Sequence, residues 1–140
     1  MKRYMLDTNM VIHLIKGHEA VAGRVASTSM ASLCISAVTE GELRFGLAKR
    51  PEAKRLHKAV SELLKCIDVL PWDSAVAQAY GLVRADMEGR GRILGSLDML
   101  IAAHAVGTDS VLVTNDYAFH QVPRLNVENW TRPDDYVAGR

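Results

Sequence analysis

Four carboxylates stand where the sequence pattern places the ends of strands or the first turns of helices. Carboxylates that converge on one rim repel each other, and a hard divalent cation with oxygen ligands supplies the compensating charge. The histidines and cysteines are scattered and lack the spacing of a zinc site. The sequence therefore predicts a Mg²⁺ or Mn²⁺ site built from Asp7, Glu42, Asp98 and Asp116.

Each of these acids also has a purely structural interpretation. Asp7 or Thr8 could cap the first helix, and Glu42 could complete a capping box with Thr39. The third acid would be stabilised at a helix N-terminus by the macrodipole, and the fourth could be a turn residue after a strand. The metal site is favoured only when all four acids are considered together.

Short apolar runs alternate with helical patterns along the chain. The runs predict strands at 4–6, 33–35, 67–70, 110–113 and 126–130. The helical patterns lie before Gly17, at 20–29, at about 38–49, from Pro51 onward, from Asp73 to Gly89 and at 97–106. This alternation favours a parallel sheet with helices on both faces, in which sites form beyond the carboxyl ends of the strands.

We therefore predict one α/β domain over residues 1–130, a three-layer α/β/α arrangement around a mostly parallel sheet. Residues 131–140 are polar and contain proline, so they are predicted to form a C-terminal tail. Three residues give local boundaries: Pro51 should open a helix, and Asp73 and Ser96 should each cap one.

Composition describes an ordinary globular chain. Hydrophobic residues make up 49% of the 140 residues and charged residues 24%, and the net charge of +1 gives no global sign of nucleic-acid binding. Cys34 and Cys66 lie in apolar stretches and are predicted to be buried free thiols of a reducing cytosol. Asp7 interrupts any secretory signal, and no segment reaches the roughly 18 apolar residues of a membrane helix. A cytoplasmic protein without a membrane association is expected.

Four motifs resemble those of the PIN-domain toxins of the VapC type. The resemblance runs from residue 4 to about Trp130, and its acidic motifs occur in the family's order with the expected elements between them. The motifs are Met5-Leu6-Asp7-Thr8-Asn9, Ile35-Ser36 with Thr39 and Glu42-Leu43-x-x-Gly46, Gly95-x-x-Asp98-x-x-Ile101-Ala102-x-His104-Ala105, and Val113-Thr114-Asn115-Asp116.

The resemblance implies a PIN-like fold and a metal-dependent endoribonuclease. It assigns catalysis and the binding of Mg²⁺ or Mn²⁺ to the four carboxylates, with Asp7 and Asp98 the strongest ligand candidates. Glu42 or Asp116 could orient the attacking water or accept its proton. The expected supporting residues are Thr8, Asn9, Thr114 and Asn115. The chain departs from many family members in carrying Ser96 where they have proline, and in its tail after Trp130.

Partners also follow from the resemblance. Family members form homodimers and are inhibited by a VapB-like antitoxin that covers the acidic groove, and they cut structured RNA, often in tRNA anticodon loops. Apolar residues of the first helix, around Val11, Ile12 and Ile15, could contact the antitoxin or a second protomer, or could pack on the sheet. Residues 44–65 contain seven basic and two acidic side chains, which could bind RNA phosphates or form a solvated helix face. Arg90 and Arg92 are equally plausible phosphate contacts.

Two other functions fit parts of the pattern. A haloacid-dehalogenase-like phosphatase places an aspartate after its first strand and a serine or threonine after its second, as Asp7 and Ser36 do, but it needs a second aspartate where this chain has Asn9. A non-catalytic nucleic-acid-binding module would use the acids only as helix caps. Dependence of RNA cleavage on a metal separates the three possibilities.

Overall fold

The computed structural model describes residues 2–132, and its centre is a sheet of five parallel strands. The strand order is β3-β2-β1-β4-β5. The strands are β1 (Arg3–Leu6), β2 (Leu33–Ser36), β3 (Asp68–Leu70), β4 (Ser110–Val113) and β5 (Val127–Glu128). The predicted tail lies outside the described residues from residue 133 onward.

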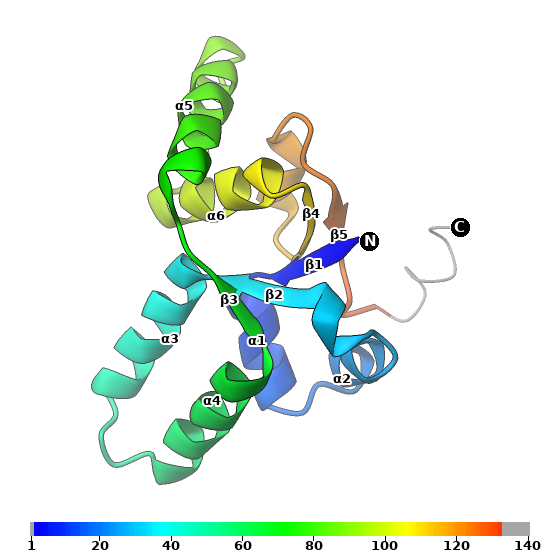
Figure 1. The fold of residues 1–140 in the computed structure, drawn as a ribbon, viewed down its shortest axis with the longest axis vertical. Helices are drawn as coiled ribbons and strands as arrows, with labels where there is room; N and C mark the ends of the chain where they lie inside the picture. The colour runs from blue at the N-terminus through cyan, green and yellow to red at the C-terminus, as the bar shows by residue number, and fades with distance from the viewer. Residues whose placement is uncertain (1, 133–140) are drawn as a thin grey trace.

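Helices cover both faces of the sheet (Figure 1). The described residues form α1 (Thr8–Ile15), α2 (Glu19–Ala26), α3 (Ala37–Ala48), α4 (Lys54–Cys66), α5 (Ser74–Gly89) and α6 (Ser96–Gly107). Two short 3₁₀ helices join them, η1 (Met30–Ser32) and η2 (Tyr117–Gln121). The predicted α/β/α fold with a parallel sheet is confirmed.

Successive side chains of a strand point to opposite faces of the sheet, so each central strand contributes to two hydrophobic cores, one on each face. One core joins the sheet to α5, α6 and η2 through Met5, Cys34, Leu112 and Phe119, among others. The second core joins it to the first four helices through Leu6, Ile35, Val113 and Trp130, among others. The central strands β1, β2 and β4 therefore bury side chains on both faces, as expected of a parallel sheet, whereas the edge strands β3 and β5 are only partly buried.

The strand order determines at which edge of the sheet a functional site can form. The chain moves outward from β1 to β2 and β3 and then returns to β4 on the other side of β1. This reversal is the switch point at which α/β sheets form their sites. The backbone N–H of Asp7 donates to the carbonyl of Val113 at 3.0 Å, so the segments that follow β1 and β4 leave the sheet side by side.

Several local predictions need correction. Pro51 does not open α4, which begins three residues later at Lys54, because residues 51 and 52 form a turn. Ser96 is the first residue of α6 and does not cap it; Gly95 occupies the N-cap position. Asp73 does cap α5, accepting the Val76 N–H at 3.1 Å.

The two cysteines differ in their surroundings. Cys34 is buried in the sheet, as predicted, whereas Cys66 is exposed at the end of α4, so the prediction of a buried thiol is wrong there. Val11 is fully buried on the sheet, whereas Ile12 is 37% exposed. No helix within residues 2–132 is long and apolar enough to span a membrane.

Candidate active site

Asp7 is a buried carboxylate at the junction of β1 and α1. Its side chain is the N-cap of α1, with Oδ1 accepting the Met10 N–H at 2.8 Å. Its Oδ2 accepts a short hydrogen bond from the Thr114 hydroxyl, which follows β4. The residue is only 4% exposed. Asp7 therefore caps a helix and also lies at the sheet edge where the other acids were predicted.

Burial and neighbouring negative charge raise the pKa of two of the acids, Asp7 and Asp98. Burial raises the pKa of Asp7 to about 6, against the lowering effect of the Thr114 and Met10 donors, and the charges of Asp98 and Asp116 raise it further. Burial also raises the pKa of Asp98, to which the charges of Asp116 and Glu42 add. The charges of Asp98 and Asp116 therefore act on Asp7, and those of Asp116 and Glu42 act on Asp98.

Glu42 is attached to the first helix through Thr8. The Thr8 hydroxyl donates to Glu42 Oε1 at 2.6 Å, and the Thr39 hydroxyl lies 3.3 Å from that of Thr8. The predicted alternative of a capping box between Thr39 and Glu42 is wrong, because Ser36 caps α3 by accepting the Val38 N–H. Thr8 thus holds Glu42 beside the residue that follows β1.

Asp98 and Asp116 complete the set from the other side of the sheet. Asp98 is half-buried in the first turn of α6, where the helix dipole favours its charge. Asp116 caps η2 by accepting the Ala118 N–H at 3.0 Å, and its own N–H donates to the Thr114 hydroxyl oxygen at 3.0 Å. Thr114 therefore connects Asp7 with the backbone of Asp116.

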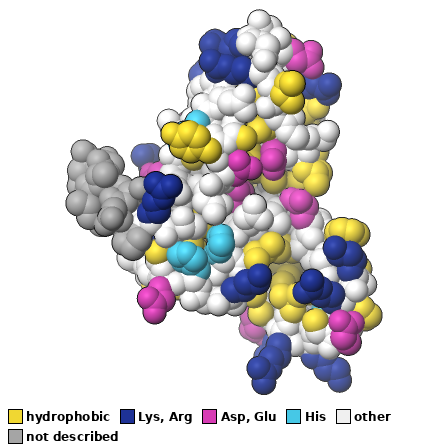
Figure 2. Space-filling model, turned by 180° about the vertical axis from the view of Figure 1, so that it is seen from behind, with side chains coloured by type: hydrophobic (Ala, Val, Ile, Leu, Met, Phe, Trp, Pro, Cys, Tyr) yellow, Lys and Arg dark blue, Asp and Glu magenta, His cyan; other side chains and the backbone are white. Residues whose placement is uncertain are grey.

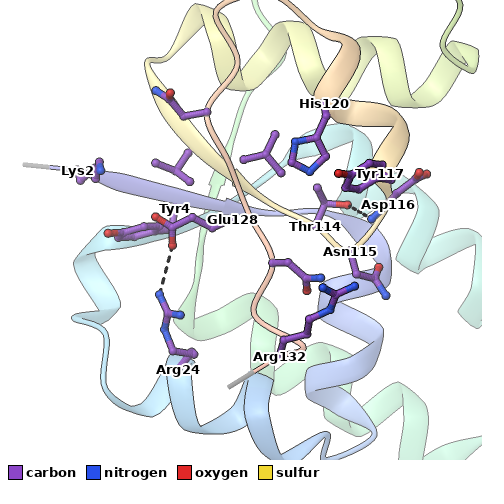
Figure 3. A pocket seen from close by; sticks show the side chains of 14 residues that line it. Lys2, Tyr4, Arg24, Thr114, Asn115, Asp116, Tyr117, His120, Glu128 and Arg132 are labelled. Atoms are coloured by element: carbon purple, nitrogen blue, oxygen red, sulfur yellow. Dashed lines mark hydrogen bonds and ion pairs between the residues drawn. The ribbon is translucent and has the colours of Figure 1, made fainter. Parts of the chain in front are cut away.

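The two predicted supporting asparagines are placed differently. Asn9 is exposed in the first turn of α1. Asn115 is exposed too, and it lines a groove beside the acids (Figure 3). Of the four predicted supporting residues, Thr8 and Thr114 are the two that hydrogen-bond to predicted catalytic carboxylates in the described part of the chain.

A buried Ser–His contact lies beneath the acids. Nδ1 of His104, on α6, is 2.7 Å from the Ser36 hydroxyl at the end of β2, and both residues are fully buried. Burial lowers the pKa of His104, which favours the neutral imidazole, and its Nε2 has no hydrogen-bond partner within residues 2–132. The contact joins the elements that carry Glu42 and Asp98. A histidine inside the apolar run of α6 was the sequence signal for its burial.

The donor set suits a hard cation. All four acids offer only oxygen, and the neighbouring Thr8 and Thr114 offer hydroxyls. Within the described residues, no three acidic, histidine or cysteine side chains are close enough to enclose an ion together. An open arrangement of this kind fits Mg²⁺, which retains several waters and binds proteins through one or two carboxylates plus substrate phosphates.

Positive charge gathers on the end of the molecule formed by α3 and α4. Figure 2 shows Asp and Glu side chains gathered near the middle of the face in view, with Lys and Arg side chains over the end formed by α3 and α4. The basic residues of the 44–65 segment are exposed on these helices and on the turn between them. Two of them form surface ion pairs, Arg44 with Glu40 and Lys65 with Glu62. A polyanion that reaches the acids would meet cationic side chains nearby.

Comparison with known proteins identifies the family. The PIN domain family matches residues 4–125. The chain is 35% identical to the tRNA(fMet)-specific endonuclease VapC of Shigella flexneri, across 94% of this chain and 100% of that protein. It is 31% identical to ribonuclease VapC2 of Haemophilus influenzae, across 93% and 99% of the two chains.

A solved structure agrees with both the fold and the sequence similarity. A chain in the crystal structure of DNA-bound VapBC from Salmonella typhimurium superimposes with a TM-score of 0.86 at 32% identity, covering 93% of this chain and 99% of that one. The protein therefore belongs to the PIN-domain family and, within it, to the VapC toxin ribonucleases of VapBC toxin–antitoxin systems.

Proposed function

We propose that residues 1–130 form a metal-dependent endoribonuclease that cuts structured RNA, with the anticodon loop of a tRNA as its target. The observation that carries this proposal is the buried carboxylate of Asp7, whose pKa is raised by burial and by the charges of Asp98 and Asp116, two acids from other segments of the chain. Buried, repelling carboxylates are costly in a structural role, and a cation would offset that cost. The name of the Shigella flexneri relative, a tRNA(fMet)-specific endonuclease, supports tRNA as the substrate class.

Asp7 and Asp98 would be the principal ligands of Mg²⁺ or Mn²⁺, with Glu42 and Asp116 completing the acidic set. A bound ion would lower the pKa of a water and offset charge on the scissile phosphate. Asp7 is fixed for this role by two hydrogen bonds from opposite sides, so its carboxylate cannot rotate freely. Asp98 lies in the first turn of α6, and within residues 2–132 no hydrogen bond engages its carboxylate, which leaves its oxygens available.

Glu42 is the better candidate for accepting the proton of the attacking water. The Thr8 hydroxyl bonds to Oε1, so the second oxygen of the carboxylate can accept a proton without losing that contact. Asp116 uses Oδ1 to cap η2, and its role would be electrostatic.

A VapB-like antitoxin is the proposed inhibitor, as the VapBC complex of the Salmonella typhimurium relative suggests. A groove of about 510 Å³ between α3 and α4 combines apolar Leu47, Val60 and Leu64 with basic Arg44 and Lys65. A protein segment with an apolar side chain and acidic neighbours would fit it. We also propose a homodimer in solution, which sedimentation of the free toxin tests directly.

Cleavage is tested with purified tRNA in Mg²⁺, in Mn²⁺ and in EDTA, for the wild type and for Asp98→Asn. We expect discrete new RNA ends with the wild type in metal and at least a 100-fold slower reaction with the variant, because one ligand of the ion is weakened. Intact RNA with the wild type in both metals would contradict the proposal and favour a binding module. Release of phosphate from small monoesters would favour the phosphatase.

The Thr8 contact gives a second prediction. Thr8→Val keeps the shape of the side chain but removes the donor to Glu42, so we expect kcat for RNA cleavage to fall by about 10- to 100-fold with little change in KM. Thr28→Val is the matched control, because the Thr28 hydroxyl donates to the Arg24 carbonyl at the end of α2. Equal kcat values for the two variants would show that Thr8 does not position Glu42.

A further inference from the structure

A second groove begins at the acidic site and follows the β4–β5 side of the sheet. It has a volume of about 880 Å³, and Thr114, Asn115 and Asp116 form one end of it. Figure 3 shows Tyr117 beside Asp116 at this end and Lys2 at the opposite end. The groove therefore connects the catalytic edge with a surface that the proposed chemistry does not use.

An aromatic pair stands at the catalytic end of this groove. Tyr117 and His120 lie three residues apart in η2, and residues at this spacing eclipse each other in a 3₁₀ helix. Their ring centroids are 4.5 Å apart at an interplanar angle of 51°. Asp116 is the cap of η2, so the position of the rings is coupled to that of a catalytic carboxylate.

The ring of Tyr117 takes no part in the two hydrophobic cores. Its side chain is 83% exposed, whereas Phe119 in the same short helix is 1% exposed and supplies the helix's contact with the core. Burying a second aromatic ring would stabilise the fold, and an exposed one leaves that stabilisation unused. A surface tyrosine packed against a histidine offers a flat apolar face on which a nucleobase can stack.

Cationic and amide side chains also line the groove. Lys2 and Arg132 contribute positive charge, and Asn115, Asn126 and Asn129 contribute amide groups that can hydrogen-bond to bases or to sugar hydroxyls. Arg24 also lines it but is engaged with Glu128 and the ring of Trp130. A lining that combines cationic and amide groups with apolar surface from Val111 and Val127 suits a single nucleic-acid strand, which has a charged backbone and bases with apolar faces.

We infer that this groove binds the single-stranded RNA segment adjoining the scissile phosphate, with an unpaired base stacked on Tyr117. The inference rests on the proposed ribonuclease function and deepens it, since it names where the RNA lies outside the acids. Tyr117 is then a positioning and affinity residue, and the amide-lined part of the groove contacts the nucleotides that follow.

The test compares Tyr117→Ala with Tyr117→Phe in cleavage of initiator tRNA. Stacking of a base on an aromatic side chain contributes binding free energy that Tyr117→Ala removes. We therefore expect Tyr117→Ala to raise KM by about 5- to 150-fold, with a much smaller change in kcat. Tyr117→Phe retains the ring and should keep KM within about twofold of the wild type. The matched control is Leu82→Ala, which also truncates a large exposed side chain. Leu82 lies on α5 and does not line the groove.

Photo-crosslinking gives an independent readout. Initiator tRNA carrying 5-iodouridine in the anticodon loop is bound to the Asp98→Asn protein, irradiated and digested, and the crosslinked peptide is identified by mass spectrometry. We expect the crosslink at Tyr117 and its loss in the Tyr117→Ala, Asp98→Asn protein. Since the crosslink needs no cleavage, it remains informative even if the wild type does not cut this RNA.

The outcomes separate the two proposals. Wild-type cleavage with an unchanged KM for Tyr117→Ala and no crosslink at Tyr117 would overturn the groove and leave the ribonuclease intact. Absence of cleavage together with a crosslink at Tyr117 would overturn the ribonuclease and support an RNA-binding groove. If Tyr117→Ala weakens binding of a VapB-like antitoxin and leaves KM for tRNA unchanged, the groove accepts protein, and the inference is wrong.

Discussion

Asp7→Asn is expected to abolish RNA cleavage while making the metal-free protein more stable. The substitution removes the carboxylate at the centre of the acidic set, so we expect cleavage to fall by at least about 100-fold. The same change removes a negative charge that is 4% exposed and repelled by Asp98 and Asp116. The raised pKa of Asp7, about 6 against 3.8, shows that its ionised form is penalised in the folded state.

Hydrogen bonding limits the gain in stability. Asparagine can keep the cap, because its carbonyl oxygen can accept the Met10 N–H that Asp7 accepts now. Its amide cannot accept from the Thr114 hydroxyl, so that short contact is weakened. Taking about 3 kcal/mol for the relieved charge and about 1–2 kcal/mol for the lost hydrogen bond, we expect a net stabilisation of about 1–2 kcal/mol near pH 7.

Urea denaturation of the two proteins in EDTA measures this difference, alongside cleavage assays in Mg²⁺. Asp73→Asn is the matched control, since Asp73 also caps a helix but is exposed and lies at the start of α5. It should change neither stability nor activity appreciably. Destabilisation by Asp7→Asn at neutral pH would mean that Asp7 serves the fold as a cap and that burial of its charge is not costly.

The sheet could be predicted from the sequence because its strands are short apolar runs between polar turns. All five predicted strands overlap observed ones, although β5 keeps only Val127–Glu128 of the predicted 126–130. The proximity of Asp7 and Asp116 follows from this pattern, because β1 and β4 are neighbours whose carboxyl ends share one edge. Helix starts were less predictable, since Pro51 suits a turn as well as the first turn of a helix.

Contacts between distant residues could not be predicted. Thr8 and Glu42 are 34 residues apart, and Ser36 and His104 are 68 apart, so no local pattern links either pair. The two interpretations of Asp7, helix cap or site residue, do not exclude each other, because a carboxylate has two oxygens. Oδ1 caps α1 and Oδ2 bonds to Thr114. The exposed ring of Tyr117 was missed because η2 is too short to give a periodic signal.

As the pH rises from about 4 to about 6, the free energy of unfolding of the metal-free wild type should decrease relative to that of Asp7→Asn. The folded-state pKa of Asp7 lies above its ordinary value of 3.8, so the folded protein binds the proton more tightly than the unfolded chain does. This proton-linked stabilisation is fully present below the ordinary pKa and is lost as pH rises through about 6. The shift corresponds to a total of about 3 kcal/mol.

Denaturation curves at several pH values in EDTA test this, with the stability difference between wild type and Asp7→Asn as the measured quantity. Taking the difference cancels the titration of groups that both proteins share, except for groups coupled to Asp7 such as Asp98, whose charge raises the pKa of Asp7. Adding Mg²⁺ near pH 7 should restore stability to the wild type and have little effect on the variant, because an ion that binds only the folded state stabilises it. A difference that stays constant across this pH range would show that Asp7 carries its charge without penalty, and the electrostatic argument for the metal site would then fail.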